Sequence, residues 1–354
     1  MSWADCELGD VVTLKRGHDL PNGRRVQGVI PVVSSSGITG WHNEAKAEPP
    51  GVVTGRYGTI GEVFYLDRPY WPLNTALYAI DFHGNDPRFV AYFLRNHLRN
   101  YQSEKAAVPG VDRNVLHKMK VRCPDPQAQE RIVSILSAYD DLIENNRRRI
   151  GLLEQAARLL YREWFVHFRF PGHETAKFVD GMPEGWERCA VDDLLILQRG
   201  FDLPVGNRKE GSVPVYGSTG IVGYHNEPKI PAPAIITGRS GSLGQVVLCD
   251  VPCWPLNTAL WVKELKGVPA SFAFFLLINL ELSKYNGGAS VPTLDRKVVH
   301  RLAVVRPAQN VLDQFDHMAT TSFQTIAKLQ KHNAHLTRAR DLLLPRLMDG
   351  RIPV

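Results

Sequence analysis

The 354-residue chain is long enough for two domains with connecting elements, and its 22% charged residues are ordinary for a globular protein. A net charge of +6 and a pI near 9.0 favour a polyanionic partner such as nucleic acid, although many basic proteins bind none. No apolar stretch reaches the roughly 18 residues of a membrane helix, and acidic residues among the first ten positions argue against a signal peptide. Five scattered cysteines suit a reducing compartment, so we expect a cytoplasmic protein with no membrane partner.

One unit is written twice along the chain. Trp71–Leu77 returns unchanged as Trp254–Leu260, and Gly37–Glu44 returns with small changes as Gly220–Glu227. The interval is the same for both motifs (254 − 71 = 183 and 220 − 37 = 183), and about half of the positions from Trp3 to Leu77 match without a gap. The repeat is far longer than the roughly 20–50 residues of a solenoid unit, so each copy is a whole domain plus its connector.

The first 124 residues predict a β-rich domain. Short β-branched and aromatic runs alternate with Gly, Pro, Ser and Asn, which is typical of short strands and turns, at Val29–Val33, Val52–Val53, Glu62–Leu66 and Leu77–Phe82. Asp86 and Pro87 then predict the N-terminus of a helix. After a loop around Val108–Gly110, a short strand near Met119–Cys123 and then Pro124 close the domain.

A long helix is predicted from about Gln127 to Trp164. Two interleaved seven-residue series run through it, in which only Asn146 is polar, and such a residue fixes the register of a coiled coil. At 1.5 Å per residue this helix would be roughly 55–60 Å long. The second copy repeats the series more weakly between Phe315 and Leu347. Two such helices in one chain most simply pair with each other.

We therefore predict an α+β fold with two β-rich globular domains separated by two long antiparallel coiled-coil helices, the copies being related by a pseudo-twofold axis. The first domain is expected at residues 1–124 and the first helical region at 125–170. The second domain is expected at 171–307 and the second helical region at 308–354. Two domains related by a twofold axis suit two half-sites on duplex DNA.

Four motifs support a family resemblance, namely Gly37–Glu44, Thr54–Gly61, Trp71–Thr75 and Arg340–Gly350. With the duplicated layout, they resemble the DNA-specificity subunits of Type I restriction-modification systems over essentially the whole chain. The resemblance implies two target-recognition domains, each reading one half of a bipartite DNA target. It also implies helical regions that hold two methyltransferase (modification) subunits, to which restriction subunits add. It implies no cofactor in this chain, since S-adenosylmethionine, ATP and Mg²⁺ are expected on the partner subunits.

The two copies are more alike than the target-recognition domains of this family often are. We therefore expect half-sites that are identical or closely related, so that the whole target is near-palindromic. Positions where the copies differ, such as Tyr57 against Ser240, are where the preference of the two halves is expected to diverge.

Basic and hydrogen-bonding residues near the predicted turns are candidates for DNA contacts. They are Arg16, Arg24, Arg25, Ser34, Ser36, Arg56, Tyr57, Asn74 and Arg113 in the first copy, and Arg199, Arg208, Thr219, Arg239, Ser240, Asn257 and Arg296 in the second. Arg56 and Arg239 stand out because each lies between glycines, which allow the backbone to approach a partner closely. The alternatives are a solvated surface charge for each cation, a tight turn at Gly-Arg-x-Gly, and a structural turn residue at Asn74.

An aromatic cluster ends the first long helix. Tyr161, Trp164 and Phe165 provide more aromatic surface than a two-stranded seam consumes, so they form either core or a protein interface. We expect a shared role, in which part of the cluster docks a methyltransferase subunit.

No catalytic site is expected. The sequence contains neither a phosphate-binding G-x-x-x-x-G-K-[ST] loop nor the Asn/Asp-Pro-Pro-aromatic motif of adenine methyltransferases. Cys249 and Cys253 lack a second pair at zinc spacing, and the repeated His42 and His225 are expected to be structural. We therefore predict a non-catalytic subunit that binds no metal. The alternatives are an autonomous coiled-coil adaptor with duplicated β-rich ligand-binding heads, and a nuclease or methyltransferase whose motifs are unrecognised.

Overall fold

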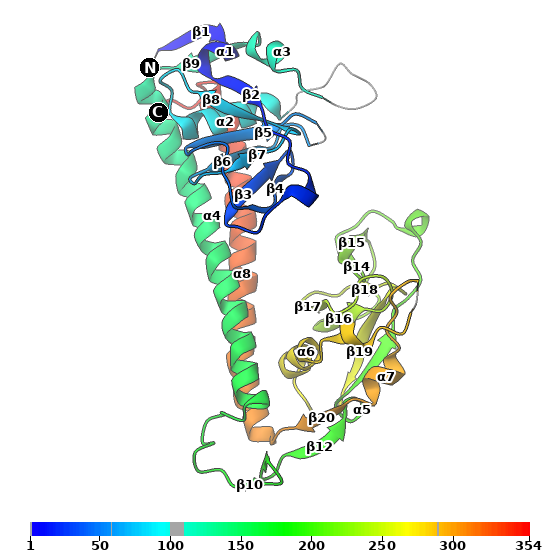
Figure 1. The fold of residues 1–354 in the computed structure, drawn as a ribbon. Coiled ribbons are helices and arrows are strands. Elements are labelled where there is room, and N and C mark those ends of the chain that lie inside the picture. Colours follow the sequence, from blue (N-terminus) through cyan, green and yellow to red (C-terminus); the bar gives the residue numbers. More distant parts are fainter. Residues whose placement is uncertain (1, 58, 100–109, 289) are drawn as a thin grey trace. The chain divides into compact units, whose positions relative to one another are not determined.

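The structure is a computed structural model that describes residues 2–57, 59–99, 110–288 and 290–354. It divides into two compact units: unit 1 comprises residues 1–147 and 331–354, and unit 2 comprises residues 148–330. Each unit contains one β-rich head and a segment of each of two long helices (Figure 1). Residues 108 and 109 of the loop expected before Gly110 lie outside the described residues.

Head 1, residues 3–124, is built from small sheets of short strands. A four-stranded antiparallel sheet has the order β2 (Thr13–Arg16), β8 (Ala76–Asp81), β5 (Gly51–Gly55) and β6 (Val63–Leu66). A three-stranded sheet has the order β4 (Gly37–His42), β3 (Ile30–Ser34) and β7 (Trp71–Pro72). Strand β1 (Trp3–Glu7) pairs with β9 (Lys120–Pro124) and so joins the two ends of the head. The short helices α1 (Leu8–Val11), η1 (Asn22–Arg24) and α3 (Arg113–His117) lie in the connections.

Helix α2 (Pro87–Leu98) contacts β5 and β6 of the larger sheet in head 1. Asp86 caps its N-terminus by accepting a hydrogen bond from the Phe89 N–H at 2.9 Å, and Pro87 occupies a position that needs no N–H. The helix start predicted from Asp86 and Pro87 is confirmed. Phe89 and Phe93 are fully buried in the core of the head. The helix therefore supplies the apolar surface that the inner face of the sheet needs.

Head 2, residues 187–306, repeats the sheets of head 1 strand for strand. The four-stranded sheet has the order β13 (Leu195–Arg199), β19 (Ala259–Leu265), β16 (Ala234–Gly238) and β17 (Val246–Cys249). The three-stranded sheet has the order β15 (Gly220–His225), β14 (Val213–Gly217) and β18 (Trp254–Pro255). Strand β12 (Glu187–Ala190) pairs with β20 (Ala303–Arg306). The connections contain α5 (Val191–Leu194), η3 (Val205–Asn207), α6 (Ala270–Asn279), η4 (Leu282–Tyr285) and α7 (Arg296–His300). The predicted α+β class and the internal repeat are confirmed.

The two long helices are α4 (Pro126–Tyr161), which continues into the π-helical turn η2 (Arg162–Val166), and α8 (Gln309–Met348). A small hairpin of β10 (Phe178–Val179) and β11 (Met182–Pro183) precedes head 2. Within the described part of the chain, no helix has both the length and the apolar character needed to cross a bilayer.

The long helices run antiparallel to each other in unit 1. Asn146 Nδ2 donates a hydrogen bond to Asn333 Oδ1 at 2.9 Å, and Asp140 forms an ion pair with Arg340, so residue numbers rise along α8 as they fall along α4. Asn146 is buried in this seam, as its position in the apolar series predicted. In unit 2 the same two helices meet at Tyr161, whose ring centroid is 6.0 Å from that of Phe315.

The contact between head and helices is polar in unit 1 and aromatic in unit 2. In unit 1 the Tyr92 hydroxyl of α2 donates a hydrogen bond to Asp140 Oδ2 at 2.6 Å, and Arg340 pairs with the same carboxylate. Burial, and then the hydrogen bond to Asp140, raise the pKa of Tyr92 far above its ordinary value, so the phenol stays a donor. At the equivalent positions of unit 2, Phe275 and Phe323 stack with ring centroids 5.8 Å apart.

The polar contact in unit 1 predicts a large effect of one carboxylate on stability. Asp140→Ala leaves the Tyr92 hydroxyl and part of the Arg340 guanidinium without a partner in a largely buried site, so we expect a loss of about 1–3 kcal/mol in the free energy of unfolding. Urea denaturation of the full chain measures it. Asp141→Ala is the matched control, because Asp141 is exposed and its ion pair with Arg88 is a surface contact at 4.0 Å. Losing this ion pair should lower the free energy of unfolding by about 0–1 kcal/mol. Equal losses in the two variants would contradict this account.

Candidate nucleic-acid interface

Four loops meet at one end of the sheets in each head, and we call them the loop cluster. In head 1 it comprises residues 16–19, 56–57, 73–75 and 110–113, and in head 2 residues 199–202, 239–240, 256–258 and 293–296. The Thr75 carbonyl accepts hydrogen bonds from the N–H groups of Arg56 at 2.9 Å and Tyr57 at 3.2 Å. The Arg56 carbonyl in turn accepts from the Val111 N–H at 2.8 Å, and the Asn74 N–H donates to the His18 carbonyl at 3.1 Å. Backbone hydrogen bonds thus fix the loops that carry the predicted arginines.

Head 2 repeats three of these backbone hydrogen bonds. The Thr258 carbonyl accepts from Arg239 N–H at 2.9 Å and Ser240 N–H at 3.1 Å, and the Arg239 carbonyl accepts from Leu294 N–H at 2.8 Å. The two loop clusters are therefore equivalent in structure as well as in sequence.

One carboxylate links the side chains of two loops in each cluster, and it lies three residues after the end of β2 in head 1 and of β13 in head 2. Asp19 accepts a hydrogen bond from the Asn74 side-chain amide and lies 3.9 Å from the Arg16 guanidinium. Asp202 makes the same contacts, with Asn257 and with Arg199 at 3.5 Å. Asn74 and Asn257 therefore act as structural turn residues, the alternative that the sequence left open. The side chains of Arg16 and Arg199 remain half-exposed, at 52% and 51%, and so stay available to a partner.

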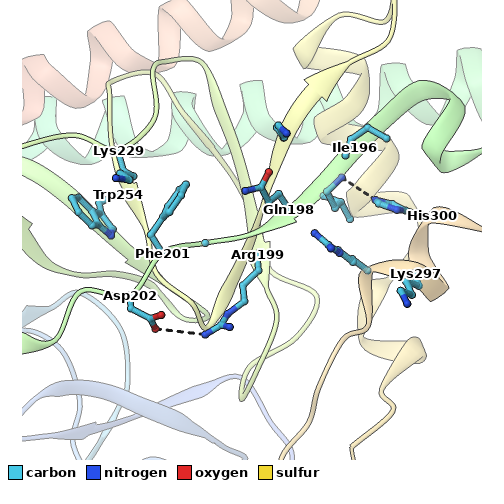
Figure 2. Close-up of a pocket in the computed structure, with 13 residues that line it drawn as sticks. Ile196, Gln198, Arg199, Phe201, Asp202, Lys229, Trp254, Lys297 and His300 are labelled. Atoms are coloured by element: carbon cyan, nitrogen blue, oxygen red, sulfur yellow. Dashed lines mark hydrogen bonds and ion pairs between the residues drawn. The ribbon is translucent and has the colours of Figure 1, made fainter.

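An open groove of about 1040 Å³ lies beside β13 in head 2 (Figure 2). Its lining contains the cations Arg199, Lys229, Lys263, Arg296 and Lys297, and Asp202 is the one carboxylate among the described residues that line it. The Lys229 ammonium lies 5.4 Å from the ring centroid of Trp254 and 5.3 Å from that of Phe201. A groove with this excess of positive charge and with aromatic walls suits a polyanion that also presents apolar surface.

Head 1 carries three of the same cations at equivalent positions. Arg16, Lys46 and Arg113 correspond to Arg199, Lys229 and Arg296 (199 − 16 = 183, 229 − 46 = 183, 296 − 113 = 183). We call each set a basic triad. The Lys46 ammonium lies 5.0 Å from the Trp71 ring centroid, which matches the stacking of Lys229 on Trp254. Sequence reasoning missed Lys46 and Lys229, although the constant interval marks them.

Ile80 and Asn114 occupy the head 1 positions of Lys263 and Lys297, so head 1 has fewer cations here. The pKa of His18 in head 1 is nevertheless lowered, first by burial and then by the nearby ammonium groups of Lys15 and Lys46. Lys15 and Lys46 therefore both lie near His18 in head 1.

Two equivalent histidines hold the short helices against the edge strands. His117 Nε2 accepts a hydrogen bond from the Leu14 N–H at 3.0 Å, and His300 Nε2 accepts from the Leu197 N–H at 2.9 Å. Burial is the first cause that lowers the pKa of both imidazoles. A neutral ring is what this contact requires, because only an unprotonated nitrogen can accept. The histidines thereby position α3 and α7, whose first residues are Arg113 and Arg296.

Several other predicted residues stabilise the outer hairpin of each head, which is β3–β4 in head 1 and β14–β15 in head 2. Arg25 Nη1 donates to the Thr39 carbonyl at 3.0 Å, and Arg208 Nη1 donates to the Val222 carbonyl at 2.9 Å. A Cβ on Gly40 or Gly223 would lie 2.6 Å from the respective guanidinium, so glycine makes room for each arginine. Ser34 is buried and bonds Ser36 Oγ at 3.0 Å within a tight turn. Ser36, its equivalent Thr219, and Arg24 of η1 are exposed.

The arginines between glycines behave differently in the two heads. The Arg56 guanidinium stacks on the Tyr57 ring at 4.4 Å from its centroid, and Tyr57 is 40% exposed. In head 2 Ser240 replaces the tyrosine, and Arg239 Nη1 donates to the Asn257 carbonyl at 3.2 Å. This pair of positions is therefore the clearest chemical difference between the two loop clusters.

The aromatic residues at the end of α4 are core residues. Tyr161, Trp164 and Phe165 are buried in unit 2, with 4%, 6% and 8% of their surface exposed. Their rings contact Phe272 and Phe315 at centroid distances between 4.9 and 6.1 Å. The prediction that part of this cluster docks a partner is corrected accordingly, because the fold uses these faces internally.

The repeated histidines of the hairpins are structural, as predicted. His42 Nδ1 accepts from the Val26 N–H at 3.0 Å, and His225 Nδ1 accepts from the Lys209 N–H at 3.0 Å. Their rings pack edge-on against Trp71 and Trp254 at 5.2 and 5.3 Å. Each histidine thereby packs its hairpin against the tryptophan ring over which the triad lysine lies.

Comparisons with known proteins agree with this arrangement. Residues 2–155 match the family model described as the Type I restriction modification DNA specificity domain. The MjaIX specificity subunit of Methanocaldococcus jannaschii is 26% identical over 278 residues, which cover 70% of this chain and 63% of that protein. The HindI specificity subunit of Haemophilus influenzae is 23% identical over 337 residues, covering 71% of this chain and 73% of that protein. The alignment thus spans less than two thirds of the MjaIX subunit.

The fold is also that of a solved specificity subunit. The crystal structure of the Type-I restriction-modification system S subunit from M. genitalium matches with a TM-score of 0.60, at 16% identity, over 98% of this chain and 96% of that chain. The fold is therefore that of a protein with duplicated β-rich heads joined to two long helices. Residues 2–155 thus match the DNA specificity domain of Type I restriction-modification systems, and the chain is similar to specificity subunits of those systems.

The two neutral histidines predict a pH dependence of stability. The folded-state pKa values of His117 and His300 lie below the ordinary 6.5, so below that pH these histidines bind more protons in the unfolded chain than in the folded chain. Stability should therefore be complete above about pH 6.5 and fall as the pH drops from there through the folded-state values. Urea denaturation midpoints between about pH 5 and pH 8 measure this dependence.

The control is a double variant, His117→Asn with His300→Asn. It should be less stable near pH 8, because both N–H acceptors are altered, and its stability should change less between pH 6.5 and pH 5. An unchanged slope in the double variant would show that other groups govern the acid sensitivity.

Proposed function

We propose that this chain is the DNA-recognition subunit of a Type I restriction-modification complex, with each head reading one half of a bipartite duplex target. The observation that carries the proposal is the pair of basic triads, Arg16–Lys46–Arg113 and Arg199–Lys229–Arg296, which stand at equivalent positions of the two heads. Cations that neutralise phosphates supply sequence-independent affinity and fix the orientation of the heads on the duplex.

Specificity requires side chains that reach the bases, and the two heads offer similar but distinct sets. The stacked pair of Arg56 and Tyr57 in head 1 corresponds to Arg239 and Ser240 in head 2. The remaining geometry of the clusters is shared. We therefore infer closely related half-sites that together make a near-palindromic target.

Exposed apolar residues on the long helices support a docking role for two modification subunits. Ile135 of α4 is 36% exposed and its equivalent Met318 of α8 is 47% exposed. Leu159 and its equivalent Leu342 are 47% and 55% exposed (318 − 135 = 183, 342 − 159 = 183). Apolar positions that stay exposed in both copies suit two copies of one partner. Restriction subunits would join through that complex, and S-adenosylmethionine, ATP and Mg²⁺ would bind the partner subunits.

Removing one triad lysine tests the proposed DNA contact. If Lys229 neutralises a phosphate, Lys229→Ala should weaken binding to all duplex sequences and lower the slope of log K against log salt by about 0.9. Lys46→Ala should do the same for head 1. Fluorescence anisotropy with a labelled duplex at several salt concentrations measures both quantities.

The matched control is Lys177→Ala, which removes an exposed lysine outside both loop clusters and should leave the slope unchanged. Equal slopes for all the variants would contradict the proposed interface. Complete absence of salt-dependent duplex binding would favour the adaptor alternative.

A second pair of variants tests the docking surface. Ile135→Ser combined with Met318→Ser removes apolar area at both equivalent positions, so binding of the modification subunit should weaken roughly tenfold or more. Duplex affinity of the chain alone should not change. Leu152→Ser is the control, because Leu152 is 65% exposed but its repeat position is His335. If the control weakens docking and the double variant does not, the surface has been wrongly placed.

A further inference from the structure

Each head exposes an aliphatic and an aromatic side chain on its outer hairpin. In head 1, Ile38 and Trp41 of β4 are 55% and 50% exposed. In head 2, Ile221 and Tyr224 of β15 are 49% and 55% exposed, at the equivalent positions (221 − 38 = 183). Single exposed apolar residues need no explanation, but the same pair exposed twice suggests a shared use.

The two side chains of each pair lie on the same face of the hairpin. Ile38 is directly opposite Val33 and Trp41 is directly opposite Pro31, and positions two residues apart on β3 share a face. The register of β14 and β15 repeats this arrangement, with Ile221 opposite Tyr216 and Tyr224 opposite Pro214. Both β4 and β15 are edge strands of their sheets, so one side of each is unpaired.

An arginine fixes the irregularity between the two apolar residues. The register of β3 and β4 shifts between Val32 and Val33, and Arg25 bonds the Thr39 carbonyl at that shift. Arg208 bonds the Val222 carbonyl at the matching shift in head 2. The edge strand is therefore held in a bulged shape with a cation in its middle, which re-aims the side chains on either side.

The hairpins lie beside segments that flank the loop clusters. At the turn, a Cβ on Gly55 would lie 3.3 Å from Ser35 Cβ, and a Cβ on Gly241 would lie 3.4 Å from Ser218 Oγ. At the far end, His42 packs on Trp71, over which Lys46 lies. The sequences of the two edge strands contain no carboxylate. Cations thus flank each apolar pair, and this charge favours DNA as the occupant over a second protein surface.

We propose that Ile38 with Trp41, and Ile221 with Tyr224, make apolar contacts with the bases of duplex DNA, one pair in each half-site. Such side chains contact thymine methyl groups in a groove or pack against a base face at a deformed step. The inference rests on the proposed function and adds to it a base-contacting element that differs from the cationic triads.

Binding measurements on the full chain with a target duplex test the proposal. Trp41→Ala should weaken binding roughly tenfold or more, because aromatic contacts with bases are lost. Its salt slope should stay unchanged, because no phosphate contact is removed. Trp41→Tyr, which places the head 2 residue in head 1, should restore most of the affinity. Tyr224→Ala should act in the same way on the other half-site.

Phe178→Ala is the control, since Phe178 is 48% exposed on β10, outside both heads. Thermal unfolding of each variant verifies folding. An unchanged duplex affinity in both Trp41→Ala and Tyr224→Ala overturns the inference, and so does a loss confined to binding of the modification subunit. Should Lys229→Ala still change the salt slope in that case, the proposed function stands without this contact. Should the unaltered chain bind no duplex, the proposed function itself fails.

Discussion

The carbonyl oxygens of Thr75 and Thr258 are the junctions on which the arrangement of each loop cluster depends. Each accepts hydrogen bonds from two backbone N–H groups of the loop that contains Arg56 or Arg239. The carbonyl of that arginine then accepts a hydrogen bond from the fourth loop of the cluster. An N–H group left unpaired in a buried loop is costly, so these bonds hold the four loops in one arrangement. Because the junction occurs twice, the loop backbones have the same arrangement in both heads, whereas the Arg56 and Arg239 side chains make different contacts.

The heads differ more in how they contact the long helices than in what they show to solvent. Unit 1 uses the Tyr92–Asp140–Arg340 group, whereas unit 2 uses stacked Phe275 and Phe323. A polar contact needs every partner in place, and an aromatic contact tolerates small shifts in position. The two heads thus share strand order but contact the long helices through side chains of different kinds.

Much of the fold was predictable because it depends on local pattern and on the repeat. The constant interval of 183 residues revealed two equivalent domains, and the seven-residue series placed Asn146 in the helical seam. The arginines were harder to interpret, because a guanidinium in a loop has the same sequence signature whether it binds a phosphate or a carbonyl. Arg25 bonds the Thr39 carbonyl, 14 residues away, across the hairpin.

Burial was the other quantity that the sequence could not supply. Tyr161, Trp164 and Phe165 are covered by α6 and α8 of unit 2, which come more than 100 residues later in the chain. The Asn74 side-chain amide donates a hydrogen bond to Asp19, which lies 55 residues earlier. A local sequence motif does not reveal a contact over this separation. Lys46 and Lys229 were missed for a different reason, because each is placed by a tryptophan ring 25 residues later in the chain, Trp71 or Trp254.

The central claim is that two equivalent heads each read one half of a single DNA target. Selection of bound duplexes from a randomised library, followed by sequencing, tests it most directly. The account predicts enriched duplexes that carry two closely related half-sites at a fixed spacing. Enrichment of one uninterrupted site or of no sequence at all would contradict the central claim, and two unrelated half-sites would contradict only the near-palindromic target.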